Sequence, residues 1–490
     1  MRIDYITSVI GIVLMYFGAL FLFPIFVAIY YSEYNALFPF LIGGIASNLF
    51  GLFLFRIFGT KTELKDIKKK EALCIVACIW ILLSLFASIP FLFFGLPLVD
   101  AIFEATSGIS TCGASILSDF SILPKSGFFW RSFCQWLGGI GIIVIFIAVL
   151  PQFAFAGRQF FFSESALQSS DRNSFRVQYY AYNIIAVYII LSISAVIALK
   201  CAGMPLFDSV CNMFSMISAG GLSPHPKSIS GYHNDAIIWV CIVFMFLAGV
   251  NFTIQYKVIF QRNFKILCRN SEYNFYFIFF TFASLLVAII ITCDADSICK
   301  GMWLKNFRNS LFHTLSIMTS TGFYCVDHDL WDAKAKMVLI SLMFVGASAG
   351  SAGGGLKIAR IVYVMRFVVR EIKLLMHPKA IIPIKLDQKS VSESIGQQII
   401  SFVFLYGVVY LIIGFIVTMI ENDILKGYLA TAITLGNTGL GFAPFGPTGG
   451  FAHMTTLSKY ILSLTMIIGR LELIPFLIIF NKDYWHISKK

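Results

Sequence analysis

The sequence predicts an all-α polytopic membrane protein, in which four repeats of helix, short re-entrant helix and helix follow two N-terminal spanning helices. Two observations lead to this fold class. The chain has 490 residues, of which 58% are hydrophobic and only 13% are charged, and its mean hydropathy is +0.83. A soluble protein cannot cover so much apolar surface with so few polar side chains. The second observation is a polar pattern that recurs four times in this apolar chain.

The first two predicted elements are spanning helices over residues 5–31 and 37–58. The first apolar run is longer than the hydrophobic region of a signal peptide, and no A-x-A cleavage pattern follows it. Each run is long enough to cross ~30 Å of hydrocarbon. We therefore expect both to remain in the mature protein as membrane spans.

The recurring pattern is a short apolar stretch that ends in small polar residues and a glycine, as in DAIFEATSGISTCGAS from Asp100. Aligned without gaps, the four copies end at Gly113, Gly221, Gly322 and Gly439. The glycines are 108, 101 and 117 residues apart. So regular a period indicates an internal repeat of roughly 110 residues. A serine stands six positions before the glycine in three copies, at Ser107, Ser215 and Ser316, and Ile433 takes its place in the fourth.

Each copy is flanked by two longer apolar runs, so each repeat contains two spanning segments. The leading runs are residues 73–94, 179–199, 275–292 and 399–420, and the trailing runs are 128–150, 237–255, 337–345 with its continuation, and 460–480. The stretch before each glycine is too short to span and is typical of a re-entrant segment. We predict ten spanning helices and these boundaries: 1–62 for the N-terminal helices, then repeats at 63–151, 152–261, 262–390 and 391–490.

The four polar turns predict a single pore. Non-helical backbone at membrane depth is tolerated only where it is buried or lines water. One cluster of small residues is most often a packing contact between helices, but four in register at a constant period favour a shared axis. Glycine permits backbone angles that other residues resist, and the negative end of each short helix would favour a cation.

Basic residues indicate the orientation of the chain. The net charge is +12, and 25 of the 37 Lys and Arg residues fall in segments that are cytoplasmic if the N-terminus is inside. This distribution follows the positive-inside rule and predicts two cytoplasmic termini. The basic excess is therefore explained by topology, and we expect no nucleic-acid binding. The basic stretch 360–389 extends a helix into the cytosol, where it serves topology alone or docks a regulator.

A glycine-rich segment interrupts the last predicted helix of the third repeat. GASAGSAGGGLK, residues 346–357, holds five glycines in its first ten positions, and each costs roughly 1 kcal/mol in a helix. We expect a break near mid-membrane that acts as a hinge, as a plug or only as a packing kink. A phosphate-binding loop is excluded, because Leu356 follows Gly355 where a lysine is required, and no strand precedes the segment.

One arginine stands near the middle of the last apolar run. Arg470 is costly there and should face a pore or a partner. The alternative is neutralisation by an internal carboxylate, and Glu472 is two residues away, on another side of the helix. Asp100 and Asp208 begin two of the short helices, where a carboxylate suits the positive helix end and could also concentrate cations at the outer mouth.

The chain resembles the Trk/Ktr/HKT superfamily of potassium transporters, most closely its TrkH-type subunits. The resemblance covers nearly the whole chain. Besides the four turns, it rests on WRSFCQWLGGIGIIV from Trp130, FMFLAGVNF from Phe244, the segment 346–360 and IIGRLELIPFLIIF from Ile467. It implies potassium uptake through a channel-like pore in the bacterial inner membrane. The alternative is a sodium-selective or sodium/proton-coupled transporter of the same superfamily.

The resemblance also implies roles for particular residues. Backbone oxygens of the turns would form a selectivity filter for K⁺. Gly113 favours potassium over sodium, whereas Cys112 and Ala219 stand where threonine is more usual. The implied filter residues are Thr111, Cys112, Gly113, Gly220, Gly221, Ser320, Thr321, Gly322, Asn437, Thr438 and Gly439. The implied gate is an intramembrane loop, residues 346–356, with a pore arginine, and comprises Gly346, Gly350, Gly353, Gly354, Gly355, Lys357 and Arg470.

The family resemblance further implies a homodimer and a separate cytosolic, TrkA-type nucleotide-binding regulatory subunit. The chain itself shows no nucleotide motif, metal spacing or catalytic arrangement, so we predict neither a cofactor nor an enzyme. Eleven cysteines include no C-x-x-C pair. Cys293, Cys299 and Cys325 lie in or near a predicted external loop, and any two of them could pair. A membrane enzyme or a scaffold would leave the four turns unexplained.

Overall fold

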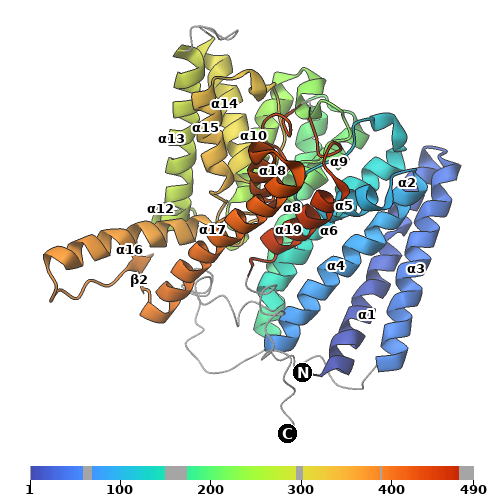
Figure 1. The fold of residues 1–490 in the computed structure, drawn as a ribbon, viewed down its shortest axis with the longest axis horizontal. Helices are drawn as coiled ribbons and strands as arrows, with labels where there is room; N and C mark the ends of the chain where they lie inside the picture. Colours follow the sequence, from blue (N-terminus) through green and yellow to red (C-terminus); the bar gives the residue numbers. More distant parts are fainter. Residues whose placement is uncertain are drawn as a thin grey trace.

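The computed structural model is built from helices in the predicted repeat order (Figure 1). Six of its helices are long and apolar enough to span a membrane, and one bent pair would make a seventh, among the residues it describes. The fold class predicted from sequence is thereby confirmed, whereas the domain boundaries stay predictions. The structure describes residues 2–58, 69–148, 174–293, 302–386, 389–447 and 449–473.

The leading helices match the predicted apolar runs closely. The first N-terminal span has one interruption, so that two helices cover it, and α3 runs back beside them. The helices are α1 (Ile3–Leu20), α2 (Leu22–Tyr30) and α3 (Tyr34–Phe58), and the four repeats lead with α4 (Lys69–Phe93), α8 (Ser174–Cys201), α13 (Ser271–Cys293) and α17 (Glu393–Glu421).

A short helix precedes each of the four glycines, as the pattern predicts. Pro97 and Pro205 stand directly before the first two, where the fixed proline φ angle leads into a helix. Asp423 caps the fourth, because its side chain accepts a hydrogen bond from the Lys426 amide. The short helices are α5 (Leu98–Ile109), α9 (Leu206–Ile217), α14 (Trp303–Met318) and α18 (Ile424–Gly436).

The trailing segments differ most from the prediction, because only the first is one long helix. In the third repeat the helix breaks at the glycine-rich segment, as expected. In the fourth, the helix ends at Arg470, and residues 474–480 of the predicted run lie outside the described part of the chain. The segments are α6 (Lys125–Ala148), α10 (Asp235–Gly249) with α11 (Phe252–Ile259), α15 (Ala333–Met343) with α16 (Ile358–Met376), and α19 (Thr456–Arg470).

The second trailing run, predicted as one span over residues 237–255, is bent by 107° between α10 and α11. Three contacts explain the bend. The Asn251 side chain starts a new helix by accepting a hydrogen bond from the Thr253 backbone amide. The side-chain amide of Gln255 donates to the carbonyls of Leu247 and Val250, which the break leaves without helical partners. Such side-chain capture of backbone groups replaces the helical ladder at the break.

The remaining elements are short connections at the ends of the long helices. The two strands pair antiparallel, with Leu386 opposite Lys389. They follow α16, which in Figure 1 extends away from the body and runs across the direction of α13. These elements are η2 (Phe120–Ile122), η4 (Ser228–Tyr232), α12 (Lys265–Arg269), η5 (His328–Leu330), β1 (Lys385–Leu386) and β2 (Lys389–Ser390).

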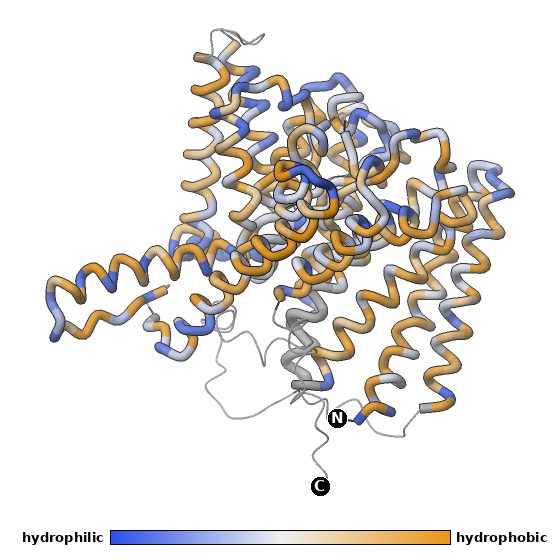
Figure 2. Tube along the Cα trace, in the orientation of Figure 1, coloured by the Kyte–Doolittle hydropathy of each residue, from blue (hydrophilic) through white to orange (hydrophobic). Residues whose placement is uncertain are grey.

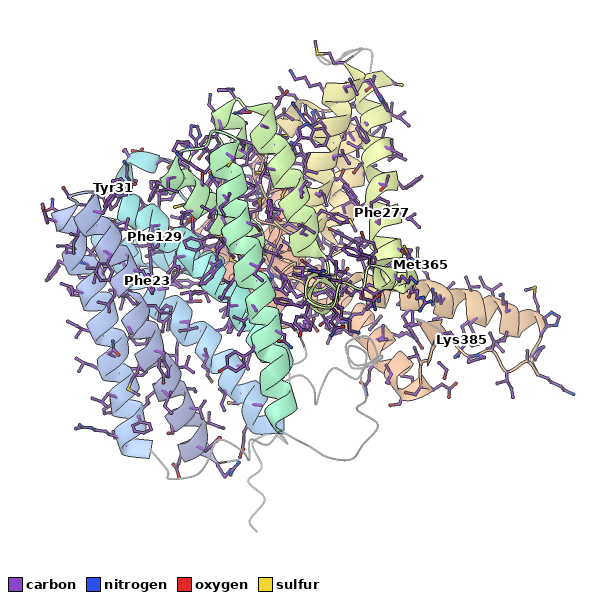
Figure 3. All side chains as sticks on the ribbon, turned by 180° about the vertical axis from the view of Figure 1, so that it is seen from behind. Phe23, Tyr31, Phe129, Phe277, Met365 and Lys385 are labelled. Atoms are coloured by element: carbon purple, nitrogen blue, oxygen red, sulfur yellow. The ribbon has the colours of Figure 1, made fainter. Side chains whose placement is uncertain are left out.

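The short helices α5, α9 and α18 lie near the centre of the molecule, between α13 on one flank and α1 and α3 on the other (Figure 1). Figure 2 shows apolar residues along the outer faces of the long helices. Phe23 and Phe277 (Figure 3) are 50% and 49% exposed on such faces. Large apolar side chains on outward faces are expected where lipid is the solvent.

An aromatic core joins the N-terminal helices to the first repeat. The Trp130 ring on α6 lies 4.3 Å from the Phe21 ring and 5.8 Å from the Phe17 ring, and its indole nitrogen donates to the Ala87 carbonyl of α4. Aromatic pairs at these separations add stabilisation beyond the area they bury. This packing positions α6, which carries several groups that reach the central turns.

Candidate functional site

The four turns share one backbone conformation. In each, the residue two positions before the glycine is left-handed, with φ between 51° and 57°, and the glycine itself has φ between 68° and 84°. Non-glycine residues rarely adopt such angles, so four copies in register are not coincidental. The left-handed residues are Thr111, Ala219, Ser320 and Asn437, and they precede Gly113, Gly221, Gly322 and Gly439.

The same hydrogen bond closes every short helix. The residue before the glycine donates its backbone N–H to the carbonyl five positions earlier, which is the Schellman arrangement for ending a helix. The helix ends are thereby fixed, and the chain leaves each helix in the same direction. The four bonds are Cys112 to Ser107 at 3.0 Å, Gly220 to Ser215 at 2.7 Å, Thr321 to Ser316 at 2.8 Å and Thr438 to Ile433 at 3.0 Å.

The four turns form a closed ring. A methyl group placed on any of the four glycines would collide with the carbonyl oxygen of the residue before the next glycine. The order is therefore repeat 1, 2, 3, 4 and back to 1, and each turn touches its two neighbours. The contacts are Gly113 with the Gly220 oxygen, Gly221 with the Thr321 oxygen, Gly322 with the Thr438 oxygen and Gly439 with the Cys112 oxygen.

All eleven filter residues named from the sequence lie in these turns. Within the ring, a carbonyl oxygen of each turn lies where a side chain of the neighbouring glycine would be, and this close approach is the reason for glycine at all four positions. Each helix presents its C-terminal end to the ring, so its partial negative charge lies there too. Such an arrangement can coordinate a cation with backbone oxygens.

The segments that leave the ring are linked to one another as well. Phe451 after the fourth turn donates its amide to the Ser115 carbonyl after the first, at 2.9 Å. The Ser230 amide donates to the Tyr324 carbonyl at 3.2 Å, and this bond joins the second repeat to the third. His328 contacts the Gly441 oxygen through its Nε2 atom at 2.8 Å, which joins the third repeat to the fourth. The ring is thus braced on the side away from the short helices.

A buried ion pair, not identified from the sequence, braces the first turn. Arg131 Nε lies 2.5 Å from Glu104 Oε1, and both side chains are almost fully buried. Arg131 also donates to the Ser115 hydroxyl at 2.8 Å and to the Ser223 carbonyl at 3.3 Å, so it reaches the second repeat. The sequence contains a signal for this pair, because a carboxylate in the middle of an apolar short helix needs a partner.

The glycine-rich segment is an ordered, non-helical loop between α15 and α16. Val345 and Leu356 form an isolated parallel bridge at its two ends, where the Gly346 amide donates to the Leu356 carbonyl at 2.7 Å. Its amides at Ser348 and Ala352 bond the last carbonyls of α10, from Gly249 and Ala248. These two bonds hold the loop against the end of α10, where the second repeat bends.

This loop lies directly beneath the third and fourth turns. The Gly354 amide donates to the Ser320 hydroxyl at 2.6 Å. A methyl group on Gly353 would approach the Thr319 carbonyl to 2.9 Å, and one on Gly354 would approach the Gly436 carbonyl to 2.6 Å. Of the gate residues predicted between 346 and 357, Gly353 and Gly354 are thus in contact with the ends of the third and fourth short helices and their turns.

Two buried cations adjoin the loop. Arg470 Nη1 donates to the Ala352 carbonyl at 2.8 Å, and Lys357 Nζ donates to the Gly353 carbonyl. The side chain of Arg470 is 4% exposed, and its Nε and Nη2 atoms make no hydrogen bond within the described part of the chain. Glu472 pairs with Arg360 instead, so the nearby carboxylate does not neutralise Arg470 directly.

The other residues singled out from the sequence lie away from the loop. Asp100 and Asp208 are in the first turns of α5 and α9, as expected. Asp100 forms an ion pair of 2.7 Å with Lys459. Cys293 and Cys325 are free thiols, and Cys299 lies outside the described residues.

Comparison with known proteins identifies the architecture. The family model of the TrkH cation transport proteins matches residues 40–487. The chain belongs to this family. It is 28% identical over 492 residues to the Trk system potassium uptake protein TrkH of Salmonella typhimurium, which covers 98% of this chain and 99% of that protein. It is 29% identical over 486 residues to the Trk system potassium uptake protein TrkG of Escherichia coli, covering 98% of each.

The fold agrees with a solved member of the same kind. The crystal structure of the potassium transporter TrkH from Vibrio parahaemolyticus superposes with a TM-score of 0.88 at 28% identity, over 99% of this chain and 100% of that one. The TrkH-family resemblance drawn from the sequence is therefore confirmed, and the chain is a polytopic membrane transporter of the cation transport class.

Proposed function

We propose that this TrkH-family chain takes up K⁺ through a channel-like pore whose selectivity filter is the ring of four turns. The observation that carries the proposal is the ring itself, in which a carbonyl oxygen of each turn lies against the glycine of a neighbouring turn, in cyclic order through all four repeats. The names of the relatives support the choice of ion, because each is a potassium uptake protein.

The filter would work by exchanging water for backbone oxygens. A K⁺ ion that enters the ring loses hydration and is coordinated by the carbonyls of Cys112, Gly220, Thr321 and Thr438. The four helix ends add a favourable potential without a bound anion. A membrane potential supplies about 2.3 kcal/mol per charge for each 100 mV, so uptake needs no nucleotide hydrolysis in this chain.

The gate would be the loop beneath the ring together with Arg470. The loop is held under the third and fourth turns by the Ser320 hydroxyl, and Arg470 pins its Ala352 carbonyl. In this position the loop obstructs the path below the filter, and the guanidinium adds an electrostatic barrier to cations. Opening requires the loop to leave these contacts.

Assembly and location are proposed on the family resemblance. We infer a homodimer in the bacterial inner membrane, with both termini in the cytoplasm, and a cytosolic nucleotide-binding subunit that controls the gate. The positive charge of the expected cytoplasmic segments supports the orientation. The ion passes through and is cargo, so no other cofactor is required for conduction.

Growth of a bacterium that lacks its own potassium uptake tests the function. The parent chain, expressed with a regulatory subunit, should restore growth at low potassium and accumulate rubidium. Gly113→Ser should weaken the preference for K⁺ over Na⁺, because Gly113 touches the neighbouring carbonyl in the ring. Gly407→Ser is the matched control, since a side chain at Gly407 would meet nothing within 4 Å. Sodium uptake by the parent chain without growth at low potassium would replace the potassium assignment with the sodium-selective alternative.

A further inference from the structure

The second turn differs from the other three at one position. The residue directly before the ring glycine carries a side chain in three repeats, as Cys112, Thr321 and Thr438, but it is Gly220 in the second. The φ angle of Gly220 is not positive, so the backbone conformation does not demand glycine there. Another cause must account for the missing side chain.

In the other three repeats this side chain is anchored behind the turn. Cys112 Sγ lies 3.8 Å from the Ile433 carbonyl, and Thr438 Oγ1 lies 3.4 Å from the same oxygen. Thr321 Oγ1 lies 2.8 Å from Thr319 Oγ1. Each contact ties the residue whose carbonyl belongs to the ring to its surroundings, and so limits rotation of that peptide group.

Gln135 on α6 takes this place in the second repeat. Its Nε2 atom donates to the Gly220 carbonyl at 2.7 Å, and its Oε1 atom accepts the Leu222 amide at 3.2 Å. One partner is an acceptor and the other a donor, so the orientation of the amide is fixed. A methyl group on Gly220 would lie 2.5 Å from Gln135 Cδ, and glycine is therefore required to admit the glutamine.

The internal repeat provides a comparison for Gln135. Gly139 on α6 packs against Ser218 of the second repeat and the Tyr188 hydroxyl, and Gly249 on α10 packs likewise against Thr319 of the third repeat and the Tyr276 hydroxyl. Gln135 precedes Gly139 by four residues, as Met245 precedes Gly249. Where the turn has its own threonine, Thr321, the neighbouring helix thus carries methionine, which forms no such bidentate contact.

We propose that Gln135 is a positioning residue for ion selection, because its amide substitutes for the missing side chain of the second turn and fixes the Gly220 carbonyl in the ring. The proposal rests on the proposed function of the ring as a filter. A hydrogen-bond donor on one of four ring oxygens also makes this oxygen a weaker ligand than the other three. The second turn would then contribute to ion selection through the position of the Gly220 carbonyl, which Gln135 of the first repeat fixes.

The test is the bi-ionic reversal potential of the full-length chain in lipid bilayers, with K⁺ on one side and Na⁺ on the other. Gln135→Met introduces the residue that α10 of the second repeat carries at the matching position, Met245, and removes both hydrogen bonds of Gln135. Loss of the contact to the ring oxygen should lower the K⁺/Na⁺ permeability ratio about fivefold. Gln398→Met on α17, where the side chain is exposed, is the matched control and should leave the ratio unchanged.

A second substitution separates positioning from packing. Gly220→Thr alone should disrupt the turn, because Gln135 occupies the space. Combined with Gln135→Met, it recreates the threonine–methionine combination of the third repeat and should restore most of the ratio. A folded double variant no more selective than Gln135→Met contradicts the substitution argument.

The outcomes are distinguishable from failure of the proposed function. A parent chain with no preference for K⁺ overturns both proposals together. A selective parent with an unchanged ratio in folded Gln135→Met overturns the role of Gln135 alone. Where Gln135→Met does not accumulate as folded protein, Gln135→Leu decides, because it keeps an apolar stem but lacks both the donor and the acceptor. A lower ratio in this variant supports the proposal, and an unchanged ratio overturns it.

Discussion

Replacing Arg470 by methionine should open the pore. The substitution keeps an apolar stem of similar length but removes the hydrogen bond from Arg470 Nη1 to the Ala352 carbonyl of the loop. It also removes the buried positive charge below the ring. Both changes favour a conducting state in which the loop has left its position.

The size of the effect follows from this one contact. A hydrogen bond from a charged donor contributes about 1.5–3 kcal/mol, which corresponds to a shift of roughly 10-fold to 150-fold in the equilibrium between closed and open loop. If the closed loop prevails by about 100 to 1, even the smaller shift raises the open fraction from about 1% to about 9%. Basal flux should rise by the same factor.

Rubidium flux into potassium-loaded liposomes, with no regulatory subunit present, measures this basal opening. Arg370→Met is the matched control. Arg370 pairs with Glu371 on α16, so this substitution removes the same charge at a site that does not contact the loop. A folded Arg470→Met protein with the flux of the parent would refute the view that Arg470 holds the loop closed.

Three further substitutions test separate parts of the account. Gly322→Ala places a methyl group against the Thr438 carbonyl at a φ of 79°; the backbone alone costs roughly 1–2 kcal/mol, and reversal potentials should show weaker K⁺ preference. Gly354→Ala brings a methyl group within 2.6 Å of the Gly436 carbonyl, so liposome leak should increase, and unchanged leak would favour a packing kink. Glu104→Gln leaves Arg131 buried without its counter-charge, so thermal unfolding in detergent should show a loss of about 3–5 kcal/mol, and an unchanged midpoint would contradict the bracing role.

Features written in local sequence were predictable. Each of the four glycines has a positive φ angle and a direct contact with a neighbouring backbone. Both features disfavour any other residue, so the repeat can be recognised from the glycine pattern in the sequence. The break at residues 346–357 was also predictable, because clustered glycines destabilise a helix wherever it lies.

Features that depend on distant partners were not predictable in the same way. The run over residues 237–255 is apolar as far as Val250, and its bend is stabilised partly by the bond from the Phe252 amide to the Gly350 carbonyl, almost a hundred residues away. The apolar pattern around Arg470 continues to residue 480, so it gave no sign that α19 ends at this arginine. Gln135 drew no attention, because one glutamine in an apolar helix does not reveal that it reaches the Gly220 carbonyl of another repeat.

The most direct test of the central claim is to locate a bound cation in the ring. Crystals of the full-length chain grown with Tl⁺, a heavy substitute for K⁺, would show its position by anomalous scattering. The account predicts a peak enclosed by the carbonyl oxygens of Cys112, Gly220, Thr321 and Thr438, and competition of this peak by K⁺. Tl⁺ bound along the chain elsewhere, with none between these four oxygens, would contradict the assignment of the ring as the filter.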